Sequence, residues 1–246
     1  MPVGKADLHI HTRISDGMAS VETVLERAEH TTDLDVIAIT DHEDVRGGLE
    51  AQEMAAKRGL KVEVVPGAEI TTRHGHLLAL FIEETPPIFR SVEATIEAIH
   101  AQGGIAIAAH PMSWLTRSLS RRTIDRVVER AEEGVTFDAI EANLSPAGRV
   151  TARQTEERNA SLWKLPVCGG SDCHHLPQLG TGWTEFEGST AEELYAALTT
   201  GAVREGHSRP PSLREIGLGQ SLLGLAWGFS ATPRKMVRRG TWVSGR

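Results

Sequence analysis

The stretch that decides the fold is Asp7-Leu8-His9-Ile10-His11, and Asp16 follows it after a short gap. In an extended strand, successive side chains point to opposite faces, so Asp7, His9 and His11 share one face and the two apolar residues share the other. Two imidazoles on one edge, with a carboxylate just beyond, form half of a metal site. For one such short motif taken alone, a partly buried strand with hydrogen-bonded histidines is an equally good interpretation.

Length and composition favour one enzyme-sized domain. The 246 residues are 40% apolar and 24% charged, and α/β barrels of roughly 200–250 residues commonly fold as a single unit. Cys168 and Cys173 lack the CxxC spacing of a zinc ribbon or redox site, which favours buried packing residues. Because the N-terminus lacks a signal-peptide core and no apolar run is long enough to span a membrane, we expect a cytoplasmic protein without a transmembrane segment.

The net charge of −7 is unevenly distributed along the chain. The segment 208–246 carries seven Lys/Arg and one acidic residue, which leaves 19 basic and 32 acidic residues, a balance of −13, in the first 207. An acidic body repels a phosphorylated ligand unless bound cations reverse the local field. Divalent metals in the site would supply those cations.

Apolar, β-rich runs alternate with longer amphipathic stretches, which predicts an α/β fold with a parallel sheet and right-handed crossovers. Seven strands are expected, followed by a last β-like segment: 7–11, 36–39, 61–65, 76–81, 105–111, 138–143, 166–172 and 182–186. Helices are expected between them: 21–28, 45–58, 91–102, 150–164 and 190–198, with a loop and then a helix over 113–133. Seven strands would form a barrel smaller than the eight-stranded standard.

Metal-binding side chains gather where these strands end. The set comprises His9, His11, Asp41, His42, Glu69, His110, Asn143, Asp172 and His174, while His76 stands at the start of its strand. The C-terminal rim of the strands is where a β/α barrel builds its active site. Imidazoles and carboxylates without a thiolate suit Zn²⁺, Mn²⁺ and Fe²⁺ alike.

Five motifs in unbroken order resemble those of the polymerase and histidinol phosphatase (PHP) superfamily. They are His9-x-His11 with Asp16, Thr40-Asp41-His42, Pro66-Gly67-x-Glu69, Ala109-His110-Pro111 and Gly170-Ser171-Asp172-x-His174. The resemblance covers about residues 5–207. It implies a distorted seven-stranded (β/α)7 barrel of the PHP type in residues 1–207, with the active site at the C-terminal rim and three divalent metals, Mn, Zn or Fe, as cofactors.

The resemblance also divides nine ligands among the three metals. The first metal would be held by His9, His11, Glu69 and Asp172. Glu69 would bridge to the second metal, which would also take His76 and His110. The third metal would be held by Asp16, His42 and His174. Asp41 is expected to orient an imidazole, and a register error of two would exchange His76 with His74.

Two metals bridged by one carboxylate can lower the pKa of a shared water and generate hydroxide near neutral pH. Arginine near the third metal would hold phosphate oxygens, because its fork engages phosphate bidentately. The candidates are Arg117, Arg121, Arg122, Arg13, Arg149 and Arg209, although a single exposed arginine is usually only a solvated charge. We take Glu69, Asp41, Asn143 and Arg117 as the catalytic candidates.

The leading hypothesis is a metal-dependent phosphoesterase that hydrolyses a small phosphomonoester by metal-bound hydroxide. The resemblance implies nucleotides, including 3′,5′-nucleoside bisphosphates, or short oligonucleotide ends as substrates. The alternatives are a histidinol-phosphate phosphatase and a non-catalytic, metal-stabilised PHP module. The presence of every expected ligand argues against the module, while the sequence does not predict the oligomeric state.

The C-terminal segment 208–246 combines leucines and aromatics with a basic end, Arg234, Lys235, Arg238 and Arg239. We expect it to pack on the barrel. A surface anchor on an anionic membrane is the alternative. Gly219, Gly224 and Gly228 argue against a lone interfacial helix, since each glycine costs about 1 kcal/mol against alanine.

Overall fold

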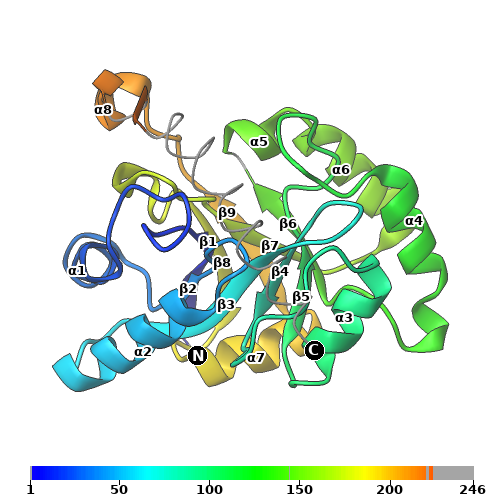
Figure 1. The fold of residues 1–246 in the computed structure, drawn as a ribbon, viewed down its shortest axis with the longest axis horizontal. Helices are drawn as coiled ribbons and strands as arrows, with labels where there is room; N and C mark the ends of the chain where they lie inside the picture. Colours follow the sequence, from blue (N-terminus) through cyan, green and yellow to red (C-terminus); the bar gives the residue numbers. More distant parts are fainter. Residues whose placement is uncertain (1, 144, 220–221, 224–246) are drawn as a thin grey trace, which may run out of the picture.

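A single nine-stranded sheet that curls into a nearly closed barrel dominates the computed structural model, which describes residues 2–143, 145–219 and 222–223 (Figure 1). The strands are β1 (Val3–Ile10), β2 (Val36–Ile39), β3 (Glu63–Thr71), β4 (His76–Leu80), β5 (Ile105–Ala108), β6 (Ala139–Asn143), β7 (Val167–Gly170), β8 (Gly182–Glu187) and β9 (Val203–His207). Their order is β7-β6-β5-β4-β3-β2-β1-β8-β9. Strands β1 to β7 are the seven expected from the sequence, so the PHP-type barrel is confirmed.

The direction of β4 differs from the expected parallel arrangement. It pairs antiparallel with both β3 and β5, and its first residue, His76, lies opposite Thr71 at the end of β3. The expectation of an all-parallel sheet is therefore wrong at this strand. Because the start of an antiparallel strand lies at the same edge as the ends of its parallel neighbours, His76 still reaches the C-terminal rim.

The sheet closes where the end of β1 meets the segment after β7. Cys173 donates its amide to the His9 carbonyl at 3.0 Å, and the His11 amide donates to the Cys173 carbonyl at 2.9 Å. The buried Asp7 carboxylate reinforces this closure by accepting the amides of Ser171 and Gly180 at 2.9 Å each. Burial raises the pKa of Asp7 to about 6, although these hydrogen bonds lower it.

Strands β8 and β9 extend the sheet beyond β1 in antiparallel pairs. The sequence indicated β8, whereas it gave no prediction for β9. Strand β9 is largely exposed, so it lacks the continuous apolar run that marks the buried strand β2. The barrel therefore has more strands, in mixed directions, than the seven expected.

Helices cover the outer face of the sheet (Figure 1). The longer ones are α1 (Val21–Thr31), α2 (Arg46–Arg58), α3 (Val92–His100), α4 (Arg121–Glu129), α6 (Ala152–Arg158) and α7 (Ala191–Thr200). The shorter ones are η1 (Ala131–Glu133), α5 (Pro146–Arg149), η2 (Asn159–Trp163), η3 (Leu176–Gln178) and α8 (Leu213–Ile216). Ser20 caps α1 by accepting the Thr23 amide, and Gly59 ends α2 with a positive φ of 62°, as expected.

Burial separates the two faces of β1. Leu8 and Ile10 are at most 1% exposed and pack into apolar clusters with the neighbouring strands and helices. The alternate residues His9 and His11 are equally buried but face the polar end of the barrel. The apolar face holds the strand in place, so the histidine positions are set by the core.

The chain continues past β9 through Ser208, whose amide donates to the Thr181 carbonyl at 2.9 Å. Leu218, Leu222 and Leu223 are exposed, and most of the leucine-rich and basic tail lies outside the described residues. The packing of residues 208–246 on the barrel stays a prediction. Within the described part of the chain, no helix has the length and apolar content needed to cross a membrane.

Candidate metal centre

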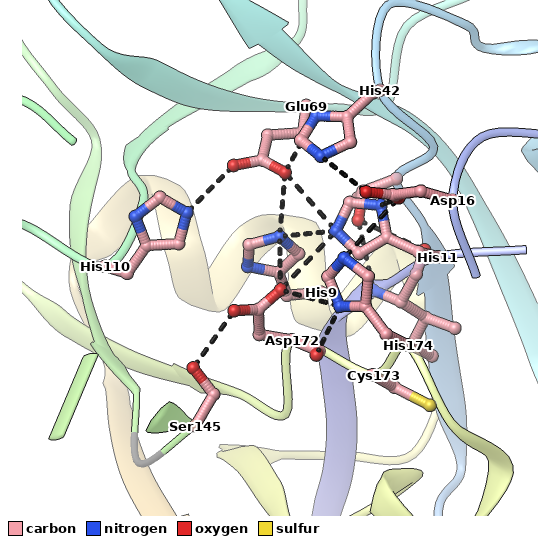
Figure 2. Close-up of polar contacts among 12 residues, drawn as sticks. His9, His11, Asp16, His42, Glu69, His110, Ser145, Asp172, Cys173 and His174 are labelled. Carbon is pink, nitrogen blue, oxygen red and sulfur yellow. Dashed lines mark hydrogen bonds and ion pairs between the residues drawn. The ribbon is translucent and has the colours of Figure 1, made fainter. Parts of the chain in front are cut away.

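Nine imidazole and carboxylate side chains converge at the C-terminal rim of the barrel, and all of them except His76 are labelled in Figure 2. They are the nine ligands expected from the sequence: His9, His11, Asp16, His42, Glu69, His76, His110, Asp172 and His174. They form four overlapping groups, and within each group one ligand atom from every residue lies within 4.8 Å of those of the others. The structure therefore brings together side chains from six separate regions of the sequence.

Glu69 stands at the middle of the cluster and is 1% exposed. Its Oε1 atom lies 2.7 Å from His76 Nδ1 and 2.9 Å from His110 Nε2. Its Oε2 atom faces three other imidazoles at 3.2–3.3 Å, those of His9, His11 and His42. Each oxygen thus belongs to a different set of nitrogens, which is the arrangement a bridging carboxylate requires. Burial alone would raise the pKa of Glu69. The surrounding imidazoles favour the charged carboxylate more strongly, so its pKa lies well below its usual value.

Asp172 completes the group around the β1 histidines. Its Oδ1 atom lies 3.5 Å from His11 Nε2 and 3.6 Å from His9 Nε2. The other oxygen, Oδ2, accepts a hydrogen bond from Ser145 Oγ at 3.0 Å, so the carboxylate is held in one orientation (Figure 2). Although burial opposes ionisation, His9 and the other facing imidazoles keep the pKa of Asp172 below its usual value.

A third group forms around Asp16, in the loop after β1. Asp16 Oδ1 lies 3.4 Å from His174 Nε2 and 3.7 Å from His11 Nδ1, and Oδ2 lies 3.6 Å from His42 Nε2. Burial lowers the pKa of His174, but the Asp16 and Asp172 carboxylates outweigh it and raise that pKa to about 10. For His42, burial is the largest effect and lowers its pKa to about 4.

Unpartnered buried atoms show that the cluster fits metal ions. Within the described residues, His42 Nδ1, His76 Nδ1 and Asp16 Oδ1 are buried and make no hydrogen bond. His76 Nδ1 lies only 2.7 Å from a Glu69 oxygen, so the two atoms are close but not aligned as donor and acceptor. Ligand atoms that point at a common ion adopt this side-by-side arrangement, and buried polar atoms without a partner are otherwise costly. The donor set of imidazoles and carboxylates suits divalent metals.

The two thiols take no part in these groups. Cys168 Sγ contacts the Ile140 carbonyl at 3.7 Å and Cys173 Sγ contacts the His175 carbonyl at 3.3 Å. Both are buried and unpaired, and burial raises the pKa of each thiol well above its usual value. They are packing residues rather than ligands for a soft metal.

Glu141 on β6 supports the ligands and was missing from the sequence-based candidates. Its Oε1 atom lies 2.9 Å from His9 Nδ1, and its Oε2 atom accepts the His110 amide at 2.7 Å. A carboxylate on the remote nitrogen of a ligating imidazole fixes the ring and its tautomer. Glu141 alternates with Asn143 on a predicted strand end, and that spacing was the signal that could have identified it.

Asp41 plays a different supporting role from the one expected. It accepts the Thr12 amide at 2.8 Å, the Thr12 hydroxyl at 2.6 Å and the Ser15 amide at 3.0 Å. It therefore fixes the turn that carries Asp16, and among the described residues it reaches an imidazole only through Ser15, whose Oγ donates to Asp41 and lies 3.4 Å from His11 Nδ1. Ser118 takes the orienting role at His110, with Oγ 2.7 Å from Nδ1.

The other candidates lie around the cluster. Asn143 is buried, and its Oδ1 atom accepts the Ser145 amide at 2.7 Å. Arg117 is exposed and donates to the Thr72 carbonyl at 3.4 Å. His74 is exposed on the turn between β3 and β4, so His76 is the member of this pair that reaches Glu69.

A pocket of about 340 Å³ adjoins the Asp172 side of the cluster. Its lining includes Ser145, which binds Asp172, and Ser171, which precedes it. Arg149 and Arg209 also line it, and Arg209 is paired with Glu215 at 2.7 Å. Pockets of this size are typical of small-ligand sites.

Comparison with known proteins agrees with this geometry. The PHP domain model matches residues 7–140, and the PHP-associated model matches residues 151–203. An uncharacterised protein of Methanocaldococcus jannaschii is 40% identical over 139 residues, covering 52% of this chain and 80% of that protein. The 5′-3′ exoribonuclease Rnm of Salmonella typhimurium is 35% identical over 34% of this chain, and the 3′,5′-nucleoside bisphosphate phosphatase of Chromobacterium violaceum is 34% identical over 33%. The matches span only 30% and 29% of those two enzymes.

Solved structures share the fold at low sequence identity. A two-domain protein from Bacteroides vulgatus that contains a PHP-like metal-dependent phosphoesterase superposes with a TM-score of 0.64 at 20% identity, covering 84% of this chain and 65% of that protein. PsfC from Pseudomonas syringae superposes with a TM-score of 0.63 at 18% identity, covering 92% of this chain and 99% of that protein. The domain match extends over more than half of the sequence, so the chain belongs to the PHP family.

Proposed function

We propose that this PHP-family phosphoester hydrolase is a metal-dependent phosphoesterase whose substrate is a small phosphomonoester. The substrate class we propose is a nucleotide, a 3′,5′-nucleoside bisphosphate or the end of a short oligonucleotide. One observation carries the proposal: the buried Glu69 presents one oxygen to His76 and His110 and the other to the β1 histidines. Such a carboxylate can bridge two divalent ions.

Three metal positions fit the clustered side chains. The two inner positions would share Glu69, with His9, His11 and Asp172 on one side and His76 and His110 on the other. The outer position would take Asp16, His42 and His174. When bound, divalent metals supply Lewis-acid chemistry that polarises phosphoryl oxygens and lowers the pKa of a coordinated water. Mn, Zn and Fe all suit these donors.

Neighbouring side chains hold the proposed ligands in position. Ser145 and Glu141 hold Asp172 and His9 in place, so the inner ligands are positioned before substrate arrives. The His174 side chain is 31% exposed, whereas Glu69 is 1% exposed, so substrate reaches the cluster from the His174 side. The phosphoryl group would be oriented beside Glu69. Arg149 and Arg209 line the pocket next to Asp172, and Arg117 lies on the His76 side; they are candidates for the remaining oxygens.

Size and charge favour a small substrate. The pocket beside Asp172 has room for one nucleotide-sized group. A long nucleic acid needs a basic track along its backbone, yet the first 207 residues carry a balance of −13. The named relatives give independent support, since one is a nucleoside bisphosphate phosphatase and another an exoribonuclease.

A phosphate-release screen with added Mn²⁺ tests the proposal. The panel contains mononucleotides, 3′,5′-bisphosphates, short oligonucleotides and histidinol phosphate, and Glu69→Gln serves as the inactive control. We expect release from the nucleotide members and none from the control. Absence of release from every member with Mn²⁺, Zn²⁺ and Fe²⁺ would refute the activity, while exclusive use of histidinol phosphate would refute the substrate class.

A further inference from the structure

Three loops meet on the rim beside His76 and His110, which both contact Glu69. Figure 2 shows His110 on the side of Glu69 away from His174. The loops are residues 72–75, 85–90 and 111–120. The Phe89 amide donates to the Thr71 carbonyl at 2.8 Å and the Arg73 amide to the Arg90 carbonyl at 2.9 Å. The His76 amide donates to the Arg117 carbonyl at 2.9 Å. The loops therefore form one continuous surface that is tied to two of the proposed ligands.

This surface is positively charged, in contrast to the rest of the barrel. The three loops contain three arginines and no acidic residue, and Arg121 and Arg122 follow directly at the start of α4, whereas the first 207 residues carry a balance of −13. All five arginines are exposed: Arg73, Arg90, Arg117, Arg121 and Arg122. Within the described residues, Arg73 and Arg117 donate to backbone carbonyls and form no ion pair with a carboxylate. Cations gathered in this way attract an anionic ligand.

Exposed apolar side chains lie among these arginines. Trp114 is 74% exposed and Phe89 40%. The Arg117 guanidinium lies 5.9 Å from the centre of the Phe89 ring. Leu115, next to Trp114, is also exposed, and a group of exposed apolar side chains bordered by charges is typical of a binding site.

Trp114 is held on an anchored loop. At one end, the His110 ring contacts Ser118 Oγ at 2.7 Å, and the His110 amide is bound by Glu141. The Met112 amide donates to the Leu119 carbonyl at 2.9 Å, which closes the loop at its base. Trp114 is therefore presented at a fixed place, four residues from His110.

We propose that the arginine–aromatic rim, defined as Arg73, Phe89, Arg90, Trp114 and Arg117, binds the nucleotides next to the scissile phosphate of a short single-stranded nucleic acid. The proposal rests on the phosphoesterase function and narrows its substrate to an oligonucleotide end. Aromatic faces stack on bases without sequence preference, and arginines bind the phosphates between them. An acidic protein partner would also be attracted by these arginines, but it would not need an aromatic face for stacking beside the metal cluster.

Steady-state kinetics with Mn²⁺-loaded protein tests the rim directly. The substrates are a 5′-phosphorylated mononucleotide and the matching trinucleotide. We expect Trp114→Ala to raise KM for the trinucleotide about tenfold with little change in kcat, and to change KM for the mononucleotide less than about twofold. Trp114→Phe should restore most of the loss. Arg153→Ala, at an exposed arginine on α6, serves as the matched surface control.

A binding measurement separates this proposal from the phosphoesterase function. Anisotropy of a 3′-labelled trinucleotide is measured with Glu69→Gln alone and with Glu69→Gln combined with Arg73→Ala and Arg90→Ala. We expect the combined variant to bind about tenfold more weakly and with a smaller dependence of its affinity on salt concentration.

Rim-dependent binding of the trinucleotide, with no phosphate release by the wild-type protein, would support the rim and overturn the phosphoesterase function. Phosphate release with equal KM changes for both substrates, or with none, would overturn the rim and leave the function standing. Rim-independent binding would also overturn it.

Discussion

The inner and outer parts of the metal centre are built in different ways. The inner ligands His9, Glu69 and His76 lie on strands and are at most 5% exposed. The outer ligands Asp16 and His174 lie on loops after β1 and β7, and the His174 side chain is 31% exposed. Strand pairing therefore sets the spacing of these three inner ligands. The other inner ligands, His11, His110 and Asp172, follow strand ends, and loop hydrogen bonds position the two outer ligands.

Side-chain clamps hold the outer loops. Asp41 binds both ends of the turn from Thr12 to Ser15, and the Gln178 side-chain oxygen accepts the amides of His174 at 3.0 Å and His175 at 2.7 Å. These clamps are side-chain hydrogen bonds rather than strand pairing, so we expect the outer loops to open at a lower free-energy cost than the strands. From this difference we predict that the proposed inner pair of metals is held more tightly than the proposed outer metal. Three experiments test this prediction, and a fourth gives a metal-independent control.

The largest effect is expected for Glu69→Gln. The change keeps the shape but removes the charge that two ions would share, so we expect kcat/KM to fall on the order of 10³-fold. Elemental analysis of the purified variant should show fewer than two tightly bound metals, against two to three in the wild type. Wild-type rates in the variant would contradict the bridging role and with it the inner site.

His174→Ala should have an intermediate effect. Only the outer position loses a ligand, so we expect one metal to be lost, the inner pair to be retained and kcat/KM to fall about 10- to 100-fold. Metal content and phosphate release are measured on the same preparation. Loss of all metals would show that the two parts of the centre are not independent.

Ser118→Ala should have a smaller effect that is confined to the inner part. Ser118 orients the His110 ring, and loss of such a partner typically weakens metal binding about 10-fold or more. We expect weaker binding of the second inner metal in a chelator competition, with the outer metal unchanged. Ser161→Ala, at an exposed serine on η2, is the matched control. If Ser118→Ala weakened binding of the outer metal instead, the inner and outer parts of the centre would not be independent.

The smallest effect is expected for the ion pair of His100 and Asp138, which is remote from the metal centre. Its contribution to the free energy of unfolding should not depend on metal, so it serves as the control for the other experiments. His100 Nε2 lies 2.9 Å from Asp138 Oδ2, and this hydrogen bond raises the pKa of His100 above its usual value, against partial desolvation. Its contribution to stability is fully present below the unfolded pKa of about 6.5 and is lost as pH rises through the folded pKa. We expect His100→Gln to lower the free energy of unfolding by a few tenths of a kcal/mol at pH 5.5 and by less at pH 8.5, since the pair is partly exposed and screened by solvent.

Urea unfolding of apoprotein and metal-loaded protein at both pH values measures this effect. The difference between wild type and His100→Gln should be the same with and without metal. A metal-dependent difference would show that the centre is coupled to the far surface.

Local patterns of the sequence determined much of this protein. The alternation in β1 placed His9 and His11 on one face, and apolar runs located seven strands. Polar strand ends, together with the resemblance to the PHP motifs, identified the nine clustered side chains. These signals are visible because strand periodicity and capping depend on neighbours within a few residues. The order of the five motifs also identified the family.

Only the tertiary structure decided which distant residues meet. Strand β4 runs antiparallel, and this direction depends on pairing with β3 and β5, which no local pattern encodes. Glu141 acquires its role only because β6 places it between His9 and His110. Likewise, the rim arginines are scattered over about 50 residues of sequence and become one surface only when three loops pack together. Long-range pairing is a property of the whole barrel, so these features followed from the fold alone.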